Sequence, residues 1–304
     1  MERDEGFFET LIGDGRPLLV LTALALMGCG AFALFQAMAG HFLPHDTEFL
    51  GMTARQLCTL RGCRVVHFMM HDRVSFGGVL LAIGVMYLWL AQFPLRRCES
   101  WAWWAIAASG GAGFLSFLAY LGYGYLDTWH GVATLALAPI FLGGLWLTRK
   151  LRRVRLAPAP RSLGRLLLLA STAGIIAGGL TITTVGMTAV FVPQDLEFMG
   201  ITVRELRAYN ANLVPLIAHD RAGFGGALVS VGVAMFLAAL YGRASRNFWQ
   251  ALGLAGLFGF ATAIGVHPVI GYNSLTHVGP AVFGCVVFVI GWVMLLQQQP
   301  EPGM

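Results

Sequence analysis

Residues 44–57 read PHDTEFLGMTARQL, and residues 193–206 read PQDLEFMGITVREL. Both stretches fit the pattern P-x-D-x-E-F-x-G-x-T-x-R-x-L, which indicates an internal repeat. The two copies match again further along, where HDR at 71–73 and FGG at 76–78 correspond to HDR at 219–221 and FGG at 224–226. A third match is the pattern G-Y-x4-H, at 124–130 and again at 271–277.

The composition of the chain indicates a membrane protein. Of its 304 residues, 57% are hydrophobic and 12% are charged, and the mean hydropathy is +0.70. A soluble domain carries about twice that share of charge, so the composition excludes an ordinary cytosolic enzyme, a disordered chain and a disulfide-dense secreted module. The net charge of +5 does not indicate nucleic-acid binding, because the basic residues lie between apolar stretches.

Eight apolar stretches have about the 20 residues that a bilayer-spanning helix needs. They are residues 17–39, 74–94, 101–123, 128–148, 163–191, 223–241, 248–267 and 275–296. Together with the repeat, they predict an all-α polytopic membrane protein of eight transmembrane helices, arranged as two tandem four-helix repeats. Each repeat has an even number of spans, so the two have the same orientation and are related by an axis along the membrane normal.

The repeat divides the chain into two domains and a linker. The first domain, 1–148, includes an outer loop at 40–73, and the second, 163–304, includes an outer loop at 192–222. Residues 149–162 form a linker, and the stretch 149–165 around it carries seven basic residues and no acidic one. The positive-inside rule places this linker in the cytoplasm, with the basic pairs at 96–97 and 243/246. We therefore predict a multi-pass protein of the cell membrane, with the lipid bilayer as its partner and both termini cytoplasmic.

The two outer loops have helix-start signals and repeated charges. Thr53 with Gln56, and Thr202 with Glu205, have the spacing of a capping box. The repeated charged residues have two interpretations, salt bridges within each loop or contacts with a ligand or metal. These residues are Asp46, Glu48, Arg55, Asp195, Glu197 and Arg204.

Two cysteines, Cys58 and Cys63, share the first outer loop, where oxidation is possible. A continuous helix would hold residues five apart too far from each other to bridge, but a break at Gly62 would let them meet. A disulfide or redox pair and two free thiols both remain open.

All eight histidines fall in outer loops or at the outer ends of spans on this topology. Four of them are repeated, at the outer ends of spans two, four, six and eight: His71, His130, His219 and His277. An ionisable side chain near membrane depth is a functional candidate by default, and imidazole is a common ligand of metals and of haem iron. We predict that His71/His130 and His219/His277 are axial ligand pairs of haem iron.

Other residues of the repeat support this hypothesis. Arg73 and Arg221 are placed to pair with haem propionates, and the Gly-Gly steps just inside would leave room for a flat macrocycle. His67, four residues before His71, suggests a weaker alternative, a small metal site on one helical face. We interpret the unrepeated histidines as surface residues, and the repeated tyrosines as interfacial aromatics. These are His41, His45 and His267, and Tyr125 and Tyr272.

The same residues also have a purely structural interpretation. Asp72 and Asp220 would cap helices, and Arg73 and Arg221 would extend to lipid headgroups. The four repeated histidines would be interfacial hydrogen-bonding groups, and the glycines would allow close helix packing.

These features resemble the haem A synthase family. That family has eight spans in two tandem four-helix bundles, with histidines at the outer ends of spans two, four, six and eight, which match His71, His130, His219 and His277. Its bacterial members typically have a cysteine pair in the first outer loop, similar to Cys58 and Cys63. The family's span-two signature places a glutamate before a His-Arg pair, whereas here an aspartate separates His71 from Arg73.

The resemblance implies a haem-binding redox protein, possessing a reacting haem in one half and a cofactor haem in the other if it is a synthase-like oxidase. The partners would then include a haem substrate or a redox protein. The alternative functions are membrane transport or ligand binding without haem, with a path between the repeats, and a non-catalytic assembly subunit.

Overall fold

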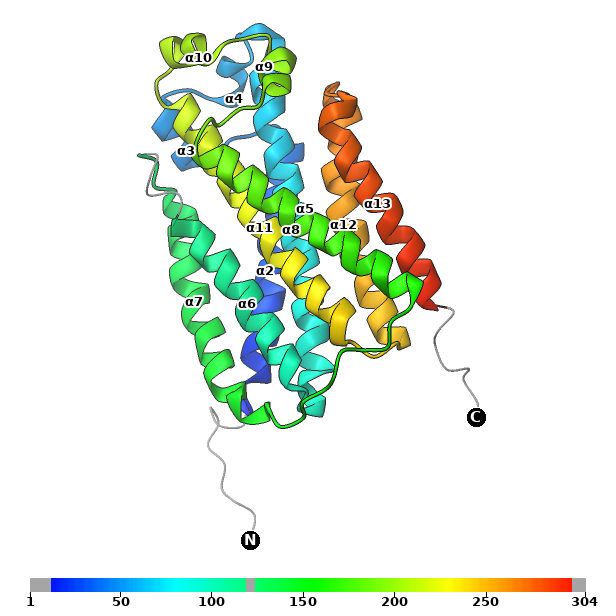
Figure 1. Ribbon diagram of the computed structural model, residues 1–304. Helices are drawn as coiled ribbons and strands as arrows, with labels where there is room; N and C mark the ends of the chain where they lie inside the picture. The colour runs from blue at the N-terminus through cyan, green and yellow to red at the C-terminus, as the bar shows by residue number, and fades with distance from the viewer. Residues whose placement is uncertain (1–11, 119–123, 297–304) are drawn as a thin grey trace.

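A computed structural model describes residues 12–118 and 124–296, and these residues form helices and connecting turns without any strand (Figure 1). Seven of the described helices are long and apolar enough to cross a membrane, as in a polytopic membrane protein. They are α2 (Arg16–Met38), α5 (Arg64–Gln92), α7 (Thr128–Thr148), α8 (Leu163–Met187), α11 (Leu213–Tyr241), α12 (Arg246–Ile270) and α13 (Leu275–Leu296). A further apolar helix, α6 (Ser100–Ser116), covers most of the predicted span 101–123, of which 119–123 lie outside the described residues.

Two helices begin earlier than predicted. Helices α5 and α11 start ten residues before the predicted spans 74–94 and 223–241, so the expected outer loops 40–73 and 192–222 end too late. His71 and His219 therefore lie inside helices and not at their first residues, and Asp72 and Asp220 are not helix caps. The charged HDR tripeptides at 71–73 and 219–221 lower the local hydropathy, so the predicted spans begin only after them. In the structure these charges are paired within the protein, which lets the helices extend through them.

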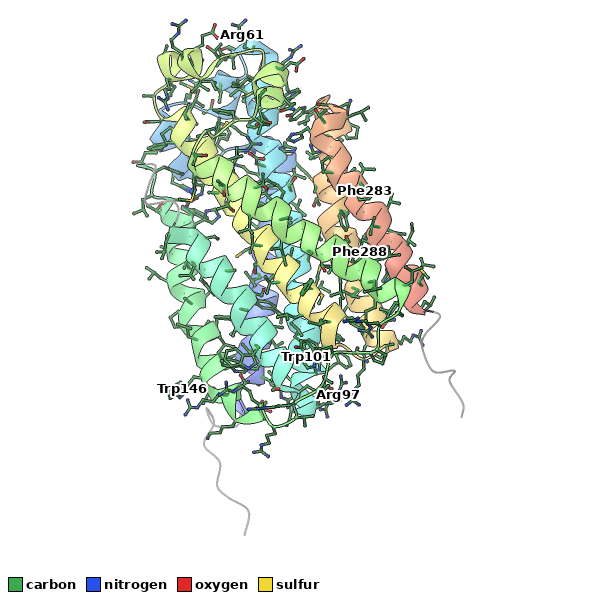
Figure 2. All side chains as sticks on the ribbon, viewed as in Figure 1. Arg61, Arg97, Trp101, Trp146, Phe283 and Phe288 are labelled. Atoms are coloured by element: carbon green, nitrogen blue, oxygen red, sulfur yellow. A yellow bond between two sulfur atoms is a disulfide. The ribbon has the colours of Figure 1, made fainter. Side chains whose placement is uncertain are left out.

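Helices α5 and α11 form the centre of the structure. In their most apolar stretches, 72% and 67% of residues are buried, against 17–22% in the other five long helices. Those outer helices expose large apolar side chains such as Phe283 of α13, whereas Phe288 on the same helix is buried (Figure 2). Exposed apolar surface of this extent is suited to contact with lipid.

The packing of the central helices crosses the boundary between the predicted repeats. Helix α5 packs against α2 and also against α12 of the second repeat, while α11 packs against α8 and also against α6 of the first. Helices α5 and α11 contact each other, so each central helix belongs to the surroundings of both repeats. This packing between the repeats determines which of the repeated histidines come into contact.

The repeated glycines lie where helices approach closely. A Cβ atom on Gly77 of α5 would lie 2.9 Å from the backbone oxygen of Gly30 on α2, and one on Gly225 of α11 would lie 2.8 Å from that of Gly179 on α8. A Cβ on Gly78 would lie 2.6 Å from the backbone oxygen of Phe258 on α12. The glycines thus allow close packing of backbones, and the expectation that they leave room for a macrocycle is wrong.

Short helices cover one end of the bundle, opposite to the end where α2 begins and α13 ends (Figure 1). They are α3 (Pro44–Leu50), α4 (Ala54–Leu57), α9 (Pro193–Met199) and α10 (Val203–Tyr209). Cys58 and Cys63 form a disulfide between α4 and α5, where Gly62 and Cys63 both have positive φ and interrupt the helix. Arg97 lies at the opposite end, far from Arg61 (Figure 2).

Candidate functional site

A network of ion pairs lies below the short helices and joins the two central helices. Arg73 of α5 donates from Nη1 to Asp46 of α3 at 2.7 Å, and from Nε to Asp220 of α11 at 2.8 Å. Asp46 is buried, and it also accepts a hydrogen bond from the backbone N–H of Leu43, which fixes the start of α3. Arg73 is therefore held by two carboxylates of the protein.

The second repeat has the matching network. Buried Arg221 of α11 donates from Nη1 to Asp195 of α9, and its Nε lies 3.6 Å from Asp72 of α5. Asp195 accepts the backbone N–H of Val192 at 2.8 Å. Arg73 and Arg221 are thus engaged with protein carboxylates, and their pairing with haem propionates stays a prediction.

Two tyrosines complete the networks. The Tyr125 hydroxyl donates to Asp46 at 2.5 Å, and the Tyr272 hydroxyl donates to Asp195 at 2.7 Å. Both rings are buried, so the expectation of interfacial aromatics is wrong. Burial and the neighbouring carboxylates raise the pKa of both hydroxyls, which therefore remain donors at neutral pH.

The first histidine cluster consists of Asp127, His130 and His219. Asp127 is the N-cap of α7 and accepts the backbone N–H of His130 at 2.9 Å, while its Oδ2 lies 2.8 Å from His130 Nδ1 and 3.4 Å from His219 Nε2. The nitrogens His130 Nδ1 and His219 Nε2 lie 3.2 Å apart, and the ring centroids lie further apart, at 5.2 Å, so the two nitrogens face each other. One carboxylate and two imidazoles could therefore ligate a single ion.

The surroundings of Asp127 favour its ionised form. Burial alone raises the pKa of this carboxyl, but hydrogen bonds with His130 and His219 outweigh burial and lower it. His45 of α3 adds a third imidazole, with Nε2 2.9 Å from Asp127 Oδ1, and its side chain is largely covered. The expectation that His45 lies on the surface is therefore wrong.

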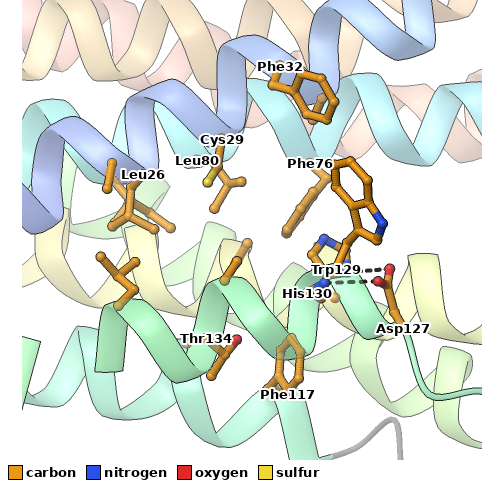
Figure 3. A pocket seen from close by; sticks show the side chains of 18 of the residues that line it. Leu26, Cys29, Phe32, Phe76, Leu80, Phe117, Asp127, Trp129, His130 and Thr134 are labelled. Carbon is orange, nitrogen blue, oxygen red and sulfur yellow. Dashed lines mark hydrogen bonds and ion pairs between the residues drawn. The ribbon is translucent and has the colours of Figure 1, made fainter. Parts of the chain in front are cut away.

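The first histidine cluster lies at the polar end of a cavity of about 530 Å³. Helices α2, α5, α6, α7 and α11 line the cavity, mostly with apolar side chains such as Leu26, Phe76 and Phe117 (Figure 3). Asp127 and His130 stand together at one end of these apolar side chains (Figure 3). A cavity of this size and polarity suits an amphipathic molecule.

The second histidine cluster consists of His71 of α5, His267 of α12 and His277 of α13. His71 Nε2 lies 3.0 Å from His267 Nε2, and the ring centroid of His277 lies 5.8 Å from that of His71 and 5.3 Å from that of His267. His267 is buried and not a surface residue. The cross-repeat packing of α5 and α11 thus joins His71 to His277 and His219 to His130, and the predicted pairs His71/His130 and His219/His277 are wrong.

Several residues singled out from the sequence stand apart from these clusters. Four of them are exposed on the short helices: Glu48, Arg55, Glu197 and Arg204. His41, before α3, and His67, on α5, are also exposed, so His67 does not share the buried site of His71. Capping boxes form at Thr53/Gln56 and Thr202/Glu205. The sequence did not identify His267 and Asp127 as members of the histidine clusters, and it did not show that the His45 side chain is largely buried. An ionisable residue within an apolar span was the available signal for His267.

No family model, curated protein or solved structure matches the chain. The resemblance to the haem A synthase family therefore stays a prediction, and the site must be interpreted from its own geometry.

Proposed function

We propose that the protein is an integral membrane redox protein that holds an iron cofactor at His130 and His219. The observation that carries this proposal is that the two imidazole nitrogens face each other, 3.2 Å apart, at the polar end of the apolar cavity. Asp127 holds the His130 ring through its carboxylate, and α11 brings His219 from the other repeat. The chain thereby supplies ligation, orientation and an apolar cavity, while the cofactor supplies the electron chemistry.

Haem is the first candidate for this cofactor. Two imidazole nitrogens on opposite sides of one metal ion lie about 4 Å apart, twice a typical metal–nitrogen bond, which is slightly longer than the present 3.2 Å. The cavity beside them is apolar and lies within the usual volume range of cofactor sites. The donor set therefore fits haem once the two rings separate slightly and the Asp127 carboxylate leaves His130 Nδ1.

A single non-haem ion is the second candidate, and the position of Asp127 favours it. Asp127 Oδ2 lies within 3.4 Å of both facing nitrogens, so the three donors resemble the two-histidine, one-carboxylate arrangement of non-haem iron sites. In this form the cavity would hold a lipid-soluble reactant next to the ion.

The absorption spectrum and iron content of the detergent-purified protein test the proposal. We expect a Soret band that is lost in His130→Ala and His219→Ala, together with one iron per chain, and both kept in His41→Ala, whose side chain is exposed. Stoichiometric iron without a Soret band would assign the non-haem form. A colourless, iron-free protein from iron-replete cells would contradict both forms.

We also propose that the chain has eight spans in two four-span repeats, with both termini cytoplasmic in the cell membrane. Matching residues make matching contacts, as with Arg73–Asp46 and Arg221–Asp195, and the stretch 149–165 after α7 carries seven basic residues and no acidic one. Reporter fusions test this topology. Fusions after 150 and after 304 should both be cytoplasmic, and a fusion after 60 should be external.

A further inference from the structure

The second histidine cluster has the arrangement of a metal-ion site. Its three imidazoles come from three different helices, α5, α12 and α13, and all three can place a nitrogen within 4.8 Å of the others. His71 and His267 are buried, and the His277 side chain is mostly covered. Converging imidazoles in a dry environment are a common way for proteins to bind transition metals.

A neighbouring carboxylate is placed to orient one of these histidines. Asp72 Oδ1 lies 3.1 Å from His71 Nδ1, whereas Asp195 Oδ1 lies 3.9 Å from His277 Nδ1, beyond hydrogen-bond distance. A carboxylate at one ring nitrogen directs the other nitrogen, Nε2, toward a metal and increases its basicity. The Nε2 atoms of His71 and His267 already face each other at 3.0 Å.

Aromatic side chains enclose the cluster. The Tyr272 ring stacks on His277, with centroids 4.4 Å apart, and the Phe68 ring lies parallel to His71 at 6.1 Å. Tyr272 and Phe68 are both buried. These rings restrict the rotation of the imidazoles, which favours a fixed ligand geometry.

The surrounding charges favour a cation. Two carboxylates, Asp72 and Asp195, lie beside this cluster, and one guanidinium, Arg221, faces both of them, which leaves one negative charge. Neutral imidazoles do not balance this charge, whereas a metal cation at their nitrogens does.

We propose that His71, His267 and His277 together bind one divalent first-row transition-metal ion, at a site separate from the iron site of the first histidine cluster. Nitrogens of a tetrahedral site with bonds near 2.0 Å lie about 3.3 Å apart, close to the 3.0 Å between His71 Nε2 and His267 Nε2. Three protein ligands leave a fourth position open for water or a small reactant, as in catalytic rather than structural sites.

The two clusters differ in chemistry although they occupy matching places in the repeat. In the G-Y-x4-H register, His267 corresponds to Tyr120 and Asp127 corresponds to Ser274. The first histidine cluster therefore offers two nitrogens and a carboxylate oxygen, and the second offers three nitrogens. Three neutral imidazoles suit zinc, copper, iron or nickel, so the duplicated scaffold has acquired two sites with different metal preferences.

Titration of chelator-stripped protein with Co²⁺ tests the proposal, because cobalt reports its coordination through visible absorption and is counted by elemental analysis. We expect the His130→Gln variant, which lacks the first site, to bind one Co²⁺ per chain. The double variant His130→Gln/His267→Gln should bind none. The matched control is His130→Gln/His67→Gln, which removes an exposed histidine one turn from His71 and should still bind one Co²⁺.

Failure of this site and failure of the iron site are distinguishable. Cobalt binding by His130→Gln that persists in the double variant overturns the proposal, as does the absence of binding in both wild type and His130→Gln. If the double variant does not fold, the cobalt spectrum of His130→Gln decides. A spectrum of tetrahedral imidazole ligation supports the proposal, and any other spectrum overturns it. The iron proposal is decided separately by the spectrum of the cobalt-free wild type.

Discussion

Arg73 of α5 donates from Nε to Oδ2 of Asp220 on α11 across 2.8 Å, and so joins the two central helices from different repeats. The matching residues pair in the opposite direction, with Arg221 of α11 3.6 Å from Asp72 of α5. The adjacent residues His71 and His219 are thereby fixed toward opposite sides of the α5–α11 contact. The crossed ion pairs thus position the ligands of both histidine clusters.

Breaking the Arg73–Asp220 pair should destabilise the protein strongly. Removing one member of a buried ion pair costs about 3–5 kcal/mol because the partner charge is left uncompensated, and Arg73→Gln leaves both Asp46 and Asp220 in that state. We expect the double variant Arg73→Gln/Asp220→Asn to lose less free energy of unfolding than the sum of the single variants. Denaturant unfolding in detergent measures all four proteins.

The control for this cycle is the exposed pair of Arg61 and Glu205, which also joins the two repeats, at 3.3 Å. Both side chains are about half exposed, so the same cycle on this pair should give less than about 1 kcal/mol. Additive single effects at Arg73 and Asp220 would show that the buried pair does not couple the helices.

Acid should lower the stability of the protein by protonating Asp46, which pairs with Arg73. Burial alone raises the pKa of this carboxyl, but Arg73 and the Tyr125 hydroxyl outweigh burial and lower it. A lowered folded-state pKa gives a stability contribution that is complete above the unfolded-state pKa of about 3.9. That contribution is lost as the pH falls through the folded-state pKa. We expect Asp46→Asn to have a shallower loss of melting temperature below about pH 4 than wild type, and Glu48→Gln, exposed on the same helix, to follow wild type.

Much of the fold follows from the sequence, because hydropathy and caps act locally. The ends of α2, α7 and α13 fall within one residue of the predicted spans. The starts of α5 and α11 could not be predicted this way, since a tripeptide such as HDR looks polar until its ion partners are known. Hydropathy measures the cost of burying a charge alone, and that cost is much lower when a partner is provided.

The candidate site could be predicted only as a set of residues. The repeat correctly directed attention to His71, His130, His219 and His277, all of which lie in the two histidine clusters. It could not say which ones meet, because two similar copies of a sequence allow pairing within a repeat or between repeats equally well. His267 and Asp127 have no repeated counterpart of the same type, so a search based on the repeat passed over them.

Close packing of α2 on α5 should be sensitive to a single methyl group. A Cβ on Gly30 would lie 2.6 Å from the backbone oxygen of Gly77, so Gly30→Ala must push the helices apart and should cost about 1–3 kcal/mol. Gly28 is on the same helix with open space around it, and Gly28→Ala should be neutral or stabilise by up to about 1 kcal/mol. Melting temperatures of the two variants test this, and equal effects would show that the helices are not in such close contact.

The role of Asp127 separates the two forms of the proposed iron site. Asparagine caps helices about as well as aspartate, so Asp127→Asn keeps the start of α7 and removes only the negative charge beside His130. With haem, iron takes the His130 Nδ1 that Asp127 contacts here, so Asp127 contributes only a nearby negative charge, and we expect the variant to retain a Soret band. With a single ion, Asp127 is itself a ligand, and the variant should lose its iron.

The Asp127→Ala variant provides the control for folding. It removes the cap as well as the charge and should cost about 1 kcal/mol more than Asp127→Asn, with the same effect on the cofactor. A difference in iron content between the two variants would indicate that the helix start, and not the carboxylate, governs cofactor binding. Asp127 contacts both the backbone N–H of His130, as a helix cap, and the His130 ring, at the cofactor site. Equal iron content in two variants of unequal stability would therefore show that the carboxylate, and not the helix start, governs cofactor binding.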